Sequence, residues 1–236
     1  MRELASSPSN TAVLRDAVWA ALGTVRDPEL DEPITDLEFV SSCTVSLDGV
    51  ATVLLRLPTF FCAANFSWLM VADAYDAVSA VPGVTRADIE LEGHFVAEEI
   101  NEGVAARSGF AAAFSGEARA ELDELRRTFN RKAALAGQDI VARPLVDAGA
   151  TPEQLAQLRL RQVPPSPELT RLRERRADGG LPHDDDAPLL LHEDGSPVTA
   201  VQVPLHLRRA RLTRVSIEGN SGTCRDLLAK RYAATS

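Results

Sequence analysis

The chain has 236 residues, of which 45% are hydrophobic and 5% aromatic, and its formal net charge at pH 7 is −9. This length and hydrophobic content suit one large domain or two small ones, with a core built mainly from Ala, Val and Leu. The net acidic charge argues against nucleic-acid binding, because that function depends on Lys and Arg side chains that neutralise phosphates.

The charge is distributed unevenly along the chain. Residues 1–100 carry 16 acidic and 5 basic side chains, whereas residues 101–236 carry 18 acidic and 20 basic ones, and this asymmetry indicates two units. The first ten residues lack the apolar stretch of a signal peptide, and no apolar run approaches the roughly 20 residues of a membrane span. With three widely spaced cysteines, the sequence predicts a cytoplasmic protein with reduced thiols and no membrane partner.

The first two predicted elements are a helix and a strand. Apolar residues recur at three- and four-residue steps over residues 11–25, which is typical of an amphipathic helix. Pro28 and Pro33 keep the following segment out of a helix. Polar and apolar residues alternate over residues 39–47, which is typical of a half-buried strand. Its inward face is predicted to carry Phe39, Cys43, Val45 and Leu47.

A hairpin and a crossover are predicted next. Asp48-Gly49 is a strong two-residue hairpin signal, and residues 50–57 are predicted to form the return strand. A helix is predicted over residues 65–81 and a third strand over residues 85–91, with Ala87, Ile89 and Leu91 inward. Since a helix separates the second and third strands, we expect them to pair in parallel within one sheet.

The rest of the chain is predicted to be mostly helical. Thr151 and Ser166 each precede a proline and are predicted helix N-caps. Helices are predicted over 94–106, 115–136 (ended by Gly137), 151 onward, 166–180, 205–217 and 224–232, and a short hairpin over 189–192 and 197–203. The predicted fold class is therefore α/β (α+β). A small αββαβ domain with a three-stranded sheet, residues 1–100, precedes a mostly helical region, residues 101–236.

Cys62 is the first candidate for a chemically active side chain. It follows a predicted strand and stands at a predicted helix start, where unpaired N–H groups and the helix dipole favour an anion. A thiolate, the form that binds metal or attacks an electrophile, is stabilised in such a place. The alternative is a small buried apolar residue, the usual role of a free cysteine. We favour that alternative for Cys43, in a strand, and for Cys224, near another predicted helix start.

The acidic loop that contains Asp27, Glu29 and Asp36 is the second candidate. Two carboxylates on a loop made rigid by proline could hold a cation or a basic group of a partner. From the residues alone, a capped and solvated loop is the favoured interpretation. The two arginine-rich stretches near residues 171–176 and 208–214 are interpreted as solvated helix faces, because no aromatic residues that could stack on bases lie beside them. Contact with the acidic N-terminal domain is the alternative for these arginines.

Common metal and catalytic motifs are absent from the sequence. There is no CxxC, HExxH, P-loop, GxGxxG or GxSxG pattern, and the four histidines share no metal-ligand spacing. Three scattered cysteines cannot hold a four-thiolate cluster within one chain. A cluster on this protein would be shared across a homodimer, completed by other ligands, or only in transit.

An ordered set of motifs nevertheless links residues 11–95 to a known family. In order they are Asp27-Pro28-Glu29-Leu30, Asp36-Leu37, the hairpin, Thr59 three residues before Cys62, and Pro82-Gly83-Val84. This order resembles the metal–sulfur (iron–sulfur) cluster assembly factor family, which includes a eukaryotic cytosolic iron–sulfur targeting subunit and bacterial SufT-like and PaaD-like factors. The resemblance covers about a third of the chain.

The resemblance implies that Cys62 is the functional cysteine, with Asp27, Glu29, Asp36 and Thr59 around it. Members deliver clusters to apoproteins or help metal-dependent oxygenases mature, and they are not known as turnover enzymes. The implied cargo is a transient iron–sulfur cluster or iron. The implied partners are a client apo-metalloprotein, with a di-iron oxygenase as one candidate, and other assembly factors.

Three positions depart from the family pattern. Glu38 stands where glycine usually follows Asp-Leu, Phe60-Phe61 precede Cys62, and Ala63 stands where proline is common. The loop is therefore bulkier and more apolar than usual. Such a loop could reshape a metal site or turn it into a docking surface for the client, with Phe60 and Phe61 in contact.

Three functional hypotheses follow. The first is a non-enzymatic assembly or maturation factor in which Cys62 handles metal or contacts the client, and the helical region recognises the client. The second is a chaperone-like binding module without a metal role, anchored by Phe60, Phe61, Phe66 and Trp68. The third, least favoured, is a cysteine enzyme that uses Cys62 with His94 and a carboxylate.

Overall fold

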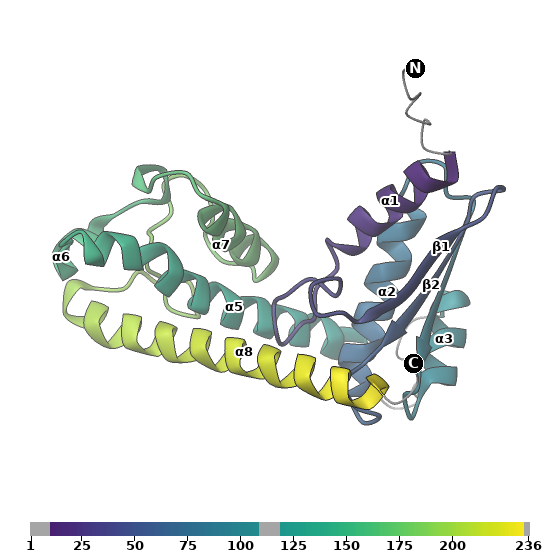
Figure 1. Cartoon of the computed structure of the whole chain (residues 1–236). Helices are drawn as coiled ribbons and strands as arrows, with labels where there is room; N and C mark the ends of the chain where they lie inside the picture. Colours follow the sequence, from purple (N-terminus) through teal and green to yellow (C-terminus); the bar gives the residue numbers. More distant parts are fainter. Residues whose placement is uncertain (1–9, 109–118, 234–236) are drawn as a thin grey trace, which may run out of the picture. The chain divides into compact units, whose positions relative to one another are not determined.

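The computed structural model describes residues 10–108 and 119–233 (Figure 1). By contacts within the chain, residues 1–122 and 221–236 form a first compact unit, and residues 123–220 form a second. The first unit thus contains the end of the chain as well as its beginning. An independent domain over residues 1–100 stays a prediction.

The first unit is built on a three-stranded mixed sheet. Strand β1 spans Val40–Val45, β2 spans Val50–Arg56 and β3 spans Arg86–Glu92. In the order β1-β2-β3, β1 pairs antiparallel with β2, and β2 pairs in parallel with β3 (Figure 1). The parallel pairing follows from the helical crossover between β2 and β3. This arrangement confirms the predicted fold class for the N-terminal part of the chain.

The turn between β1 and β2 lies one residue earlier than predicted. The Gly49 N–H donates to the Ser46 carbonyl (3.1 Å), which places Leu47 and Asp48 at the tip. Gly49 follows with a φ of 84°, a conformation that costs other residues steric strain. Leu47 is therefore 96% exposed, and its predicted place on the inward face is wrong. The alternation of a strand ends where the sheet neighbours end.

Three helices accompany the sheet. Helix α1 spans Asn10–Leu22 and α2 spans Ala64–Ser79, and the two helices pack against each other. Helix α3 spans Ala97–Ala105 and packs against α2 and β3 (Figure 1). All three were predicted, although α3 begins later than the sequence indicates.

The core of the first unit lies between the sheet and these helices. Strand β2 alternates buried and half-buried residues along its length. Burial of one large aliphatic side chain stabilises the fold by about 1.5–3 kcal/mol. The predicted inward residues of β3 are all buried: Ala87, Ile89 and Leu91.

Glu38, in the segment between α1 and β1, adopts a conformation that favours glycine. Its φ is 61°, in the left-handed region that L-residues with a Cβ occupy at a cost of about 1–2 kcal/mol. The side chain is exposed, so packing does not account for the residue. The backbone therefore keeps the conformation expected for the family's glycine, and Glu38 carries the strain.

The second unit is mostly helical, as predicted. Helix α5 spans Arg119–Asp147, α6 spans Pro152–Gln157 and α7 spans Pro167–Asp178. Helix α8 spans Val203–Tyr232 and extends from this unit into the first. Two single 3-10 turns occupy Leu160–Gln162 and Ala200–Gln202. The core is aliphatic, with Leu160, Leu172, Leu189 and Leu190 among its most buried members.

The predicted helix N-caps of this unit are confirmed. The Thr151 hydroxyl accepts from the Gln154 N–H, and the Gln154 side chain accepts from the Thr151 N–H, which completes a capping box. Ser166 Oγ accepts from the Leu169 N–H (3.1 Å) at the start of α7.

Two predicted helix ends are wrong. Helix α5 continues through Gly137, where an added Cβ would lie 3.4 Å from a methyl carbon of Leu172 in α7. Glycine there permits a close helix contact and does not act as a C-cap. Helix α8 is likewise unbroken across 218–223, where Ile217, just before the predicted gap, and Ser221, inside it, are both buried. The predicted start of α5 at residue 115 lies outside the described residues.

The predicted hairpin over 189–203 is confirmed only close to its turn. A bridge joins Leu191 to Pro197, flanked by hydrogen bonds from the His192 N–H to the Ser196 carbonyl (2.9 Å) and from the Val198 N–H to the Leu190 carbonyl (3.2 Å). The second arm ends earlier than predicted, because residues from Ala200 onward are helical. The buried amide of Gln138 accepts from the Leu191 N–H (2.7 Å) and donates to the Leu191 carbonyl (3.1 Å), so the backbone groups of Leu191 are satisfied as well.

The arginine stretch in α7 is not a fully solvated face. Arg176 is completely buried and donates to the Pro188 (2.8 Å) and Leu189 (2.5 Å) carbonyls. Burial lowers the pKa of Arg176 to about 10, which leaves the guanidinium charged at neutral pH. Its charge therefore serves to hold the loop that contains these carbonyls.

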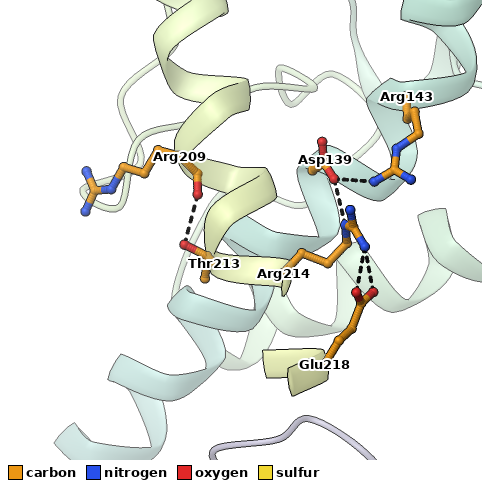
Figure 2. A network of polar contacts seen from close by, with 6 residues as sticks. All are labelled: Asp139, Arg143, Arg209, Thr213, Arg214 and Glu218. Atoms are coloured by element: carbon orange, nitrogen blue, oxygen red, sulfur yellow. Dashed lines mark hydrogen bonds and ion pairs between the residues drawn. The ribbon is translucent and has the colours of Figure 1, made fainter. Parts of the chain in front are cut away.

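A charged network joins α5 to α8 within the second unit (Figure 2). The buried Asp139 carboxylate accepts from Arg143 Nη2 (2.7 Å) and Arg214 Nε (2.7 Å). Arg214 also donates to both carboxylate oxygens of Glu218 (2.7 Å each). Hydrogen bonds to Asp139 and Glu218 raise the pKa of Arg214.

Within the described residues, no helix is both long and apolar enough to cross a membrane.

Replacing Glu38 with glycine should stabilise the first unit. We expect Glu38→Gly to raise the free energy of unfolding by about 0.5–1 kcal/mol, because it removes left-handed strain but adds unfolded-state entropy. Trp19 and Trp68 both lie in this unit, so denaturant unfolding followed by tryptophan fluorescence reports on it. Glu38→Ala keeps the strain and is the control. Equal gains from both variants would contradict the assignment of strain.

Removing Asp139 should loosen the contact between α5 and α8. Asp139→Ala leaves Arg214 and Arg143 without their shared acceptor, at a cost of about 1–3 kcal/mol. Glu218→Ala is the matched control, since the Glu218 side chain is 56% exposed and should contribute at most about 1 kcal/mol. Amide hydrogen exchange of residues 135–147 and 206–218 measures the difference. Equal protection in the two variants would show that Asp139 is not the central member.

Candidate functional site

Cys62 lies in the loop that leads from β2 to α2. Its Sγ lies 3.3 Å from Thr59 Oγ1, so the predicted pairing of Thr59 with Cys62 is seen in the structure. Ala63 is the N-cap residue of α2, and no side chain accepts a hydrogen bond at that cap. The Cys62 side chain is half-buried. The Cys62 thiol thus contacts the Thr59 hydroxyl just before the first turn of α2, and part of its surface is exposed to solvent.

His94 fixes the backbone of this loop. Its Nε2 lies 2.8 Å from the Cys62 carbonyl oxygen and 3.2 Å from Ser67 Oγ. Because a carbonyl can only accept, Nε2 carries the ring proton, and Nδ1 accepts from the Val96 N–H (3.4 Å). Burial lowers the pKa of His94, which favours the neutral ring.

These contacts bear on the cysteine-enzyme hypothesis. Both ring nitrogens of His94 face backbone groups, with Nε2 directed at the carbonyl of Cys62 rather than presented as a base to its thiol. General-base activation of a cysteine requires a free ring nitrogen within hydrogen-bond reach of the sulfur. The geometry therefore makes His94 a positioning residue for the loop.

An exposed aromatic cluster of Phe60, Phe61 and Phe95 lies beside Cys62. Phe61 is 76% exposed, and Phe60 and Phe95 are about half exposed. Ring centroids are 5.0 Å apart for Phe60–Phe61 and 6.0 Å for Phe61–Phe95. The Phe95 N–H donates to the Phe60 carbonyl (3.1 Å), which ties the two loops together. Exposed aromatic surface of this kind marks interaction sites.

Only part of this cluster was predicted from the sequence. Trp68 is 5% exposed and Phe66 is half-buried, so placing Trp68 on an exposed anchor is wrong. Phe95 was missed because it was assigned to a helix. Its position just after β3 was the available signal, since the carboxyl ends of parallel strands meet at one edge of a sheet.

Asp27 shapes the acidic loop from within. Its carboxylate is 8% exposed and accepts from the N–H groups of Glu29 and Leu30 (2.8 Å each). Burial raises the pKa of Asp27 to about 6, although both hydrogen bonds act in the opposite direction. The main role of the Asp27 side chain is therefore to form the turn of this loop. The capped-loop interpretation holds for Asp27.

Asp36 and Glu32 mark the outer part of the same loop. Asp36 is exposed, and its carboxylate lies 3.3 Å from Thr35 Oγ1. Glu32 forms an ion pair with Arg225, whose Nε also donates to the Asp36 carbonyl (3.4 Å). Arg225 lies in the part of α8 that belongs to the first unit. No local pattern predicts this partner, because 189 residues separate Arg225 from Asp36.

Cys224 precedes Arg225 in α8 and interacts electrostatically with residues of the same acidic loop. Burial raises the pKa of the Cys224 thiol to about 11, and electrostatic interactions with Asp27, Cys62 and Glu29 add to the increase. Three of the predicted site residues thus act electrostatically on Cys224. By contrast Cys43 is half-buried in β1, opposite Val53, and burial raises its pKa.

Within the described residues, no group of three or more His, Cys, Asp and Glu side chains is arranged to hold a metal ion. A site for metal here would therefore offer fewer than three such protein ligands. Open coordination positions suit a metal that passes to another molecule, whereas structural sites are closed by protein ligands.

The raised pKa of Asp27 predicts a pH-dependent stability. A folded-state pKa near 6 against 3.8 means that the folded chain binds the proton more tightly, so stability is lost as pH rises from about 4 to 6. We expect Asp27→Asn, which keeps an acceptor, to gain about 2–3 kcal/mol over wild type between pH 4 and pH 7.5. Tryptophan-monitored denaturation at both pH values measures it. A constant difference would contradict the burial argument.

Similarity to known proteins is found over the part of the chain that contains Cys62. Residues 15–91 match the sequence profile of a family described as iron–sulfur cluster assembly protein. An uncharacterised protein of Methanocaldococcus jannaschii is 29% identical over 90 residues, which are 38% of this chain and 93% of that protein. A Bacillus anthracis domain of unknown function, DUF59, has a TM-score of 0.33 and 20% identity over 42% of this chain and 95% of its own. The resemblance predicted from the sequence is confirmed: residues 15–91, about a third of the chain, match the iron–sulfur cluster assembly protein family.

Proposed function

We propose that the protein is a non-enzymatic factor for the assembly or maturation of a metal centre in a client metalloenzyme. The observation that carries the proposal is a half-buried thiol, Cys62, beside an exposed aromatic cluster in a domain that matches this family. The thiol contacts the cargo, an iron–sulfur cluster or iron, and the aromatic cluster of Phe60, Phe61 and Phe95 binds the client.

The loop is suited to these two tasks together. Its backbone is fixed by His94 through the Cys62 carbonyl and by Phe95 through the Phe60 carbonyl. The thiol and the three rings therefore share a rigid base, which lowers the entropic cost of binding. A client bound to the rings has its own metal site brought close to Cys62. An oxygenase with a di-iron centre is our first choice of client class, and cytoplasmic assembly factors are further partners.

A second function is favoured by the aromatic cluster alone. The protein would bind the client as a chaperone-like module, and Cys62 would have no role with metal. The exposure of Phe61 is compatible with either function, because docking through aromatic residues is common to both. The two functions differ in what the loss of the thiol does to the metal content of the client.

The test is made in the native host with a tagged chain. Cys62→Ala should leave a co-purifying client bound but reduce the iron in that client several-fold. Phe61→Ala should reduce co-purification about 10-fold, the effect of losing an interface contact of about 1.4 kcal/mol. Leu47→Ala, which trims another exposed apolar side chain on the far turn of the hairpin, is the control. Fully iron-loaded client with Cys62→Ala would refute the maturation role and leave the binding module.

A further inference from the structure

A cavity of about 530 Å³ lies within the second unit, where α5 ends and α6 begins. The chain reverses there at Gly149, which has a φ of 92°, and the Ala150 N–H donates to the Leu145 carbonyl (3.0 Å). An added Cβ at Gly149 would meet no atom within 4 Å, so the cavity is open beside the turn. Its volume falls within the range of about 300–1,000 Å³ that is typical of ligand sites.

Aliphatic side chains that are continuous with the core of the second unit line this cavity. Leu155 is buried in that core, and Leu145, Ala150 and Leu158 pack against it. Among the described residues that line the cavity, none carries a charge. A phosphate, a carboxylate or a metal ion would therefore lose water here without gaining a counter-charge, which is costly. The lining thus selects an uncharged ligand with an apolar part.

The polar part of the lining consists of the amides of Gln154, Gln157 and Gln162. Gln154 Oε1 accepts from the Thr151 N–H, and Gln162 Oε1 accepts from the Arg159 N–H, at 2.8 Å each. Because a backbone N–H can only donate, the oxygen of each amide is the occupied atom. The Nε2 groups of these two amides, and the whole Gln157 amide, make no hydrogen bond within the part of the chain that the structure describes. The cavity therefore offers unused N–H donors, two of which are held in place by capping interactions.

From this combination we infer that the cavity binds a short, uncharged segment of the client polypeptide. One aliphatic side chain of the segment packs on the leucines, and its backbone carbonyls accept hydrogen bonds from the glutamine amides. The inference rests on the proposed function, because it gives the client of that function a second contact with this chain. Every polypeptide offers backbone carbonyls as acceptors, and an apolar pocket adds the preference for a side chain. Since Gln154 and Gln162 are already held before the segment arrives, ordering them costs little.

The test titrates the full-length, isotope-labelled chain with N-acetyl-leucine N-methylamide and follows the chain by two-dimensional NMR. This probe is uncharged and has one aliphatic side chain and two carbonyls. The side-chain amide signals of Gln154, Gln157 and Gln162 should shift together and saturate with a Kd of about 1 mM, the affinity expected for so small a ligand. N-acetyl-aspartate N-methylamide, which is charged, and 4-methylpentan-1-ol, which lacks carbonyls, should each bind about 5-fold more weakly or worse.

Two variants locate the binding site of the probe. Ala148 is exposed and lines the cavity, so Ala148→Trp should fill the cavity and abolish binding. Gln157→Ala removes an exposed amide and should weaken binding about 2–10-fold, the effect of losing one hydrogen bond. Glu153→Ala is the matched control, since Glu153 is exposed on the same helix outside the cavity and its loss should leave the affinity unchanged.

Unmoved glutamine signals in the presence of 10 mM probe, a roughly tenfold excess over the expected Kd, would overturn the inference. Equal affinity for the alcohol would also overturn it, because the cavity would then be an apolar pocket that does not recognise a peptide. Equal affinity for the aspartate derivative would contradict the argument from the uncharged lining.

Co-purification from the native host separates the inference from the proposed function. Ala148→Trp should reduce recovery of the client about 10-fold but leave the iron content of the client that is still bound unchanged. Undiminished recovery with this variant would show that the client does not use the cavity, and only the inference would fail. If the client is loaded with iron without Cys62, the maturation role fails, whereas the cavity stands as a binding site for the client.

Discussion

The parallel pairing of β2 with β3 is the constraint on which the candidate site depends. Because both strands run the same way, Arg56 and Glu92 end at one edge of the sheet, and the loops that follow them are neighbours. This brings His94 to the Cys62 carbonyl and Phe95 to Phe60, over sequence separations of more than 30 residues. Parallel strands need a crossover helix, so α2 starts directly after the cysteine. The thiol, its supporting histidine and the exposed rings therefore all follow from one pairing of strands.

The unequal charge of the two parts of the sequence has a local counterpart in the first unit. The N-terminal hundred residues are strongly acidic, and Arg225 from the far end of the chain forms an ion pair with Glu32, beside local pairs such as that of Arg56 with Glu92. Arg231 donates to the carbonyls of Leu57 and Gly93. Partly exposed ion pairs contribute little free energy by themselves. The end of α8 instead combines them with buried Leu228, backbone carbonyls and the close approach at Gly93. In the second unit, Asp139 and Arg214 join α5 to α8 in the same manner, with side chains that are mostly buried.

Local sequence patterns predicted the secondary structure correctly where the residues within one element determine it. Alternation and period predicted the strands and the first helices, and the capping of α6 and α7 was read correctly from Thr151 and Ser166. The predictions failed where a residue far away in the sequence determines the local structure. Gly137 continues α5 beside Leu172 of α7, and the pairing of the segment around Leu191 is short because residues from Ala200 onward are helical. Arg176 is buried because loop carbonyls surround it. None of these partners lies within the window that a periodic pattern covers.

The residues of the candidate site also divide into those that local patterns predicted and those that long-range contacts brought together. The sequence by itself determined the fold class of the first part of the chain and made Cys62 the first candidate, because a strand, a short loop and a helix start are all local features. The family resemblance added Thr59, whose Oγ1 lies 3.3 Å from Cys62 Sγ. The same resemblance identified Glu38 as a departure from the family pattern. Only the tertiary structure decided that His94 supports the backbone rather than the thiol, that Phe95 completes the aromatic cluster, and that Arg225 of α8 pairs with Glu32 in the acidic loop. These depend on strand pairing and on an unbroken α8, and both arise from packing between residues far apart in the chain.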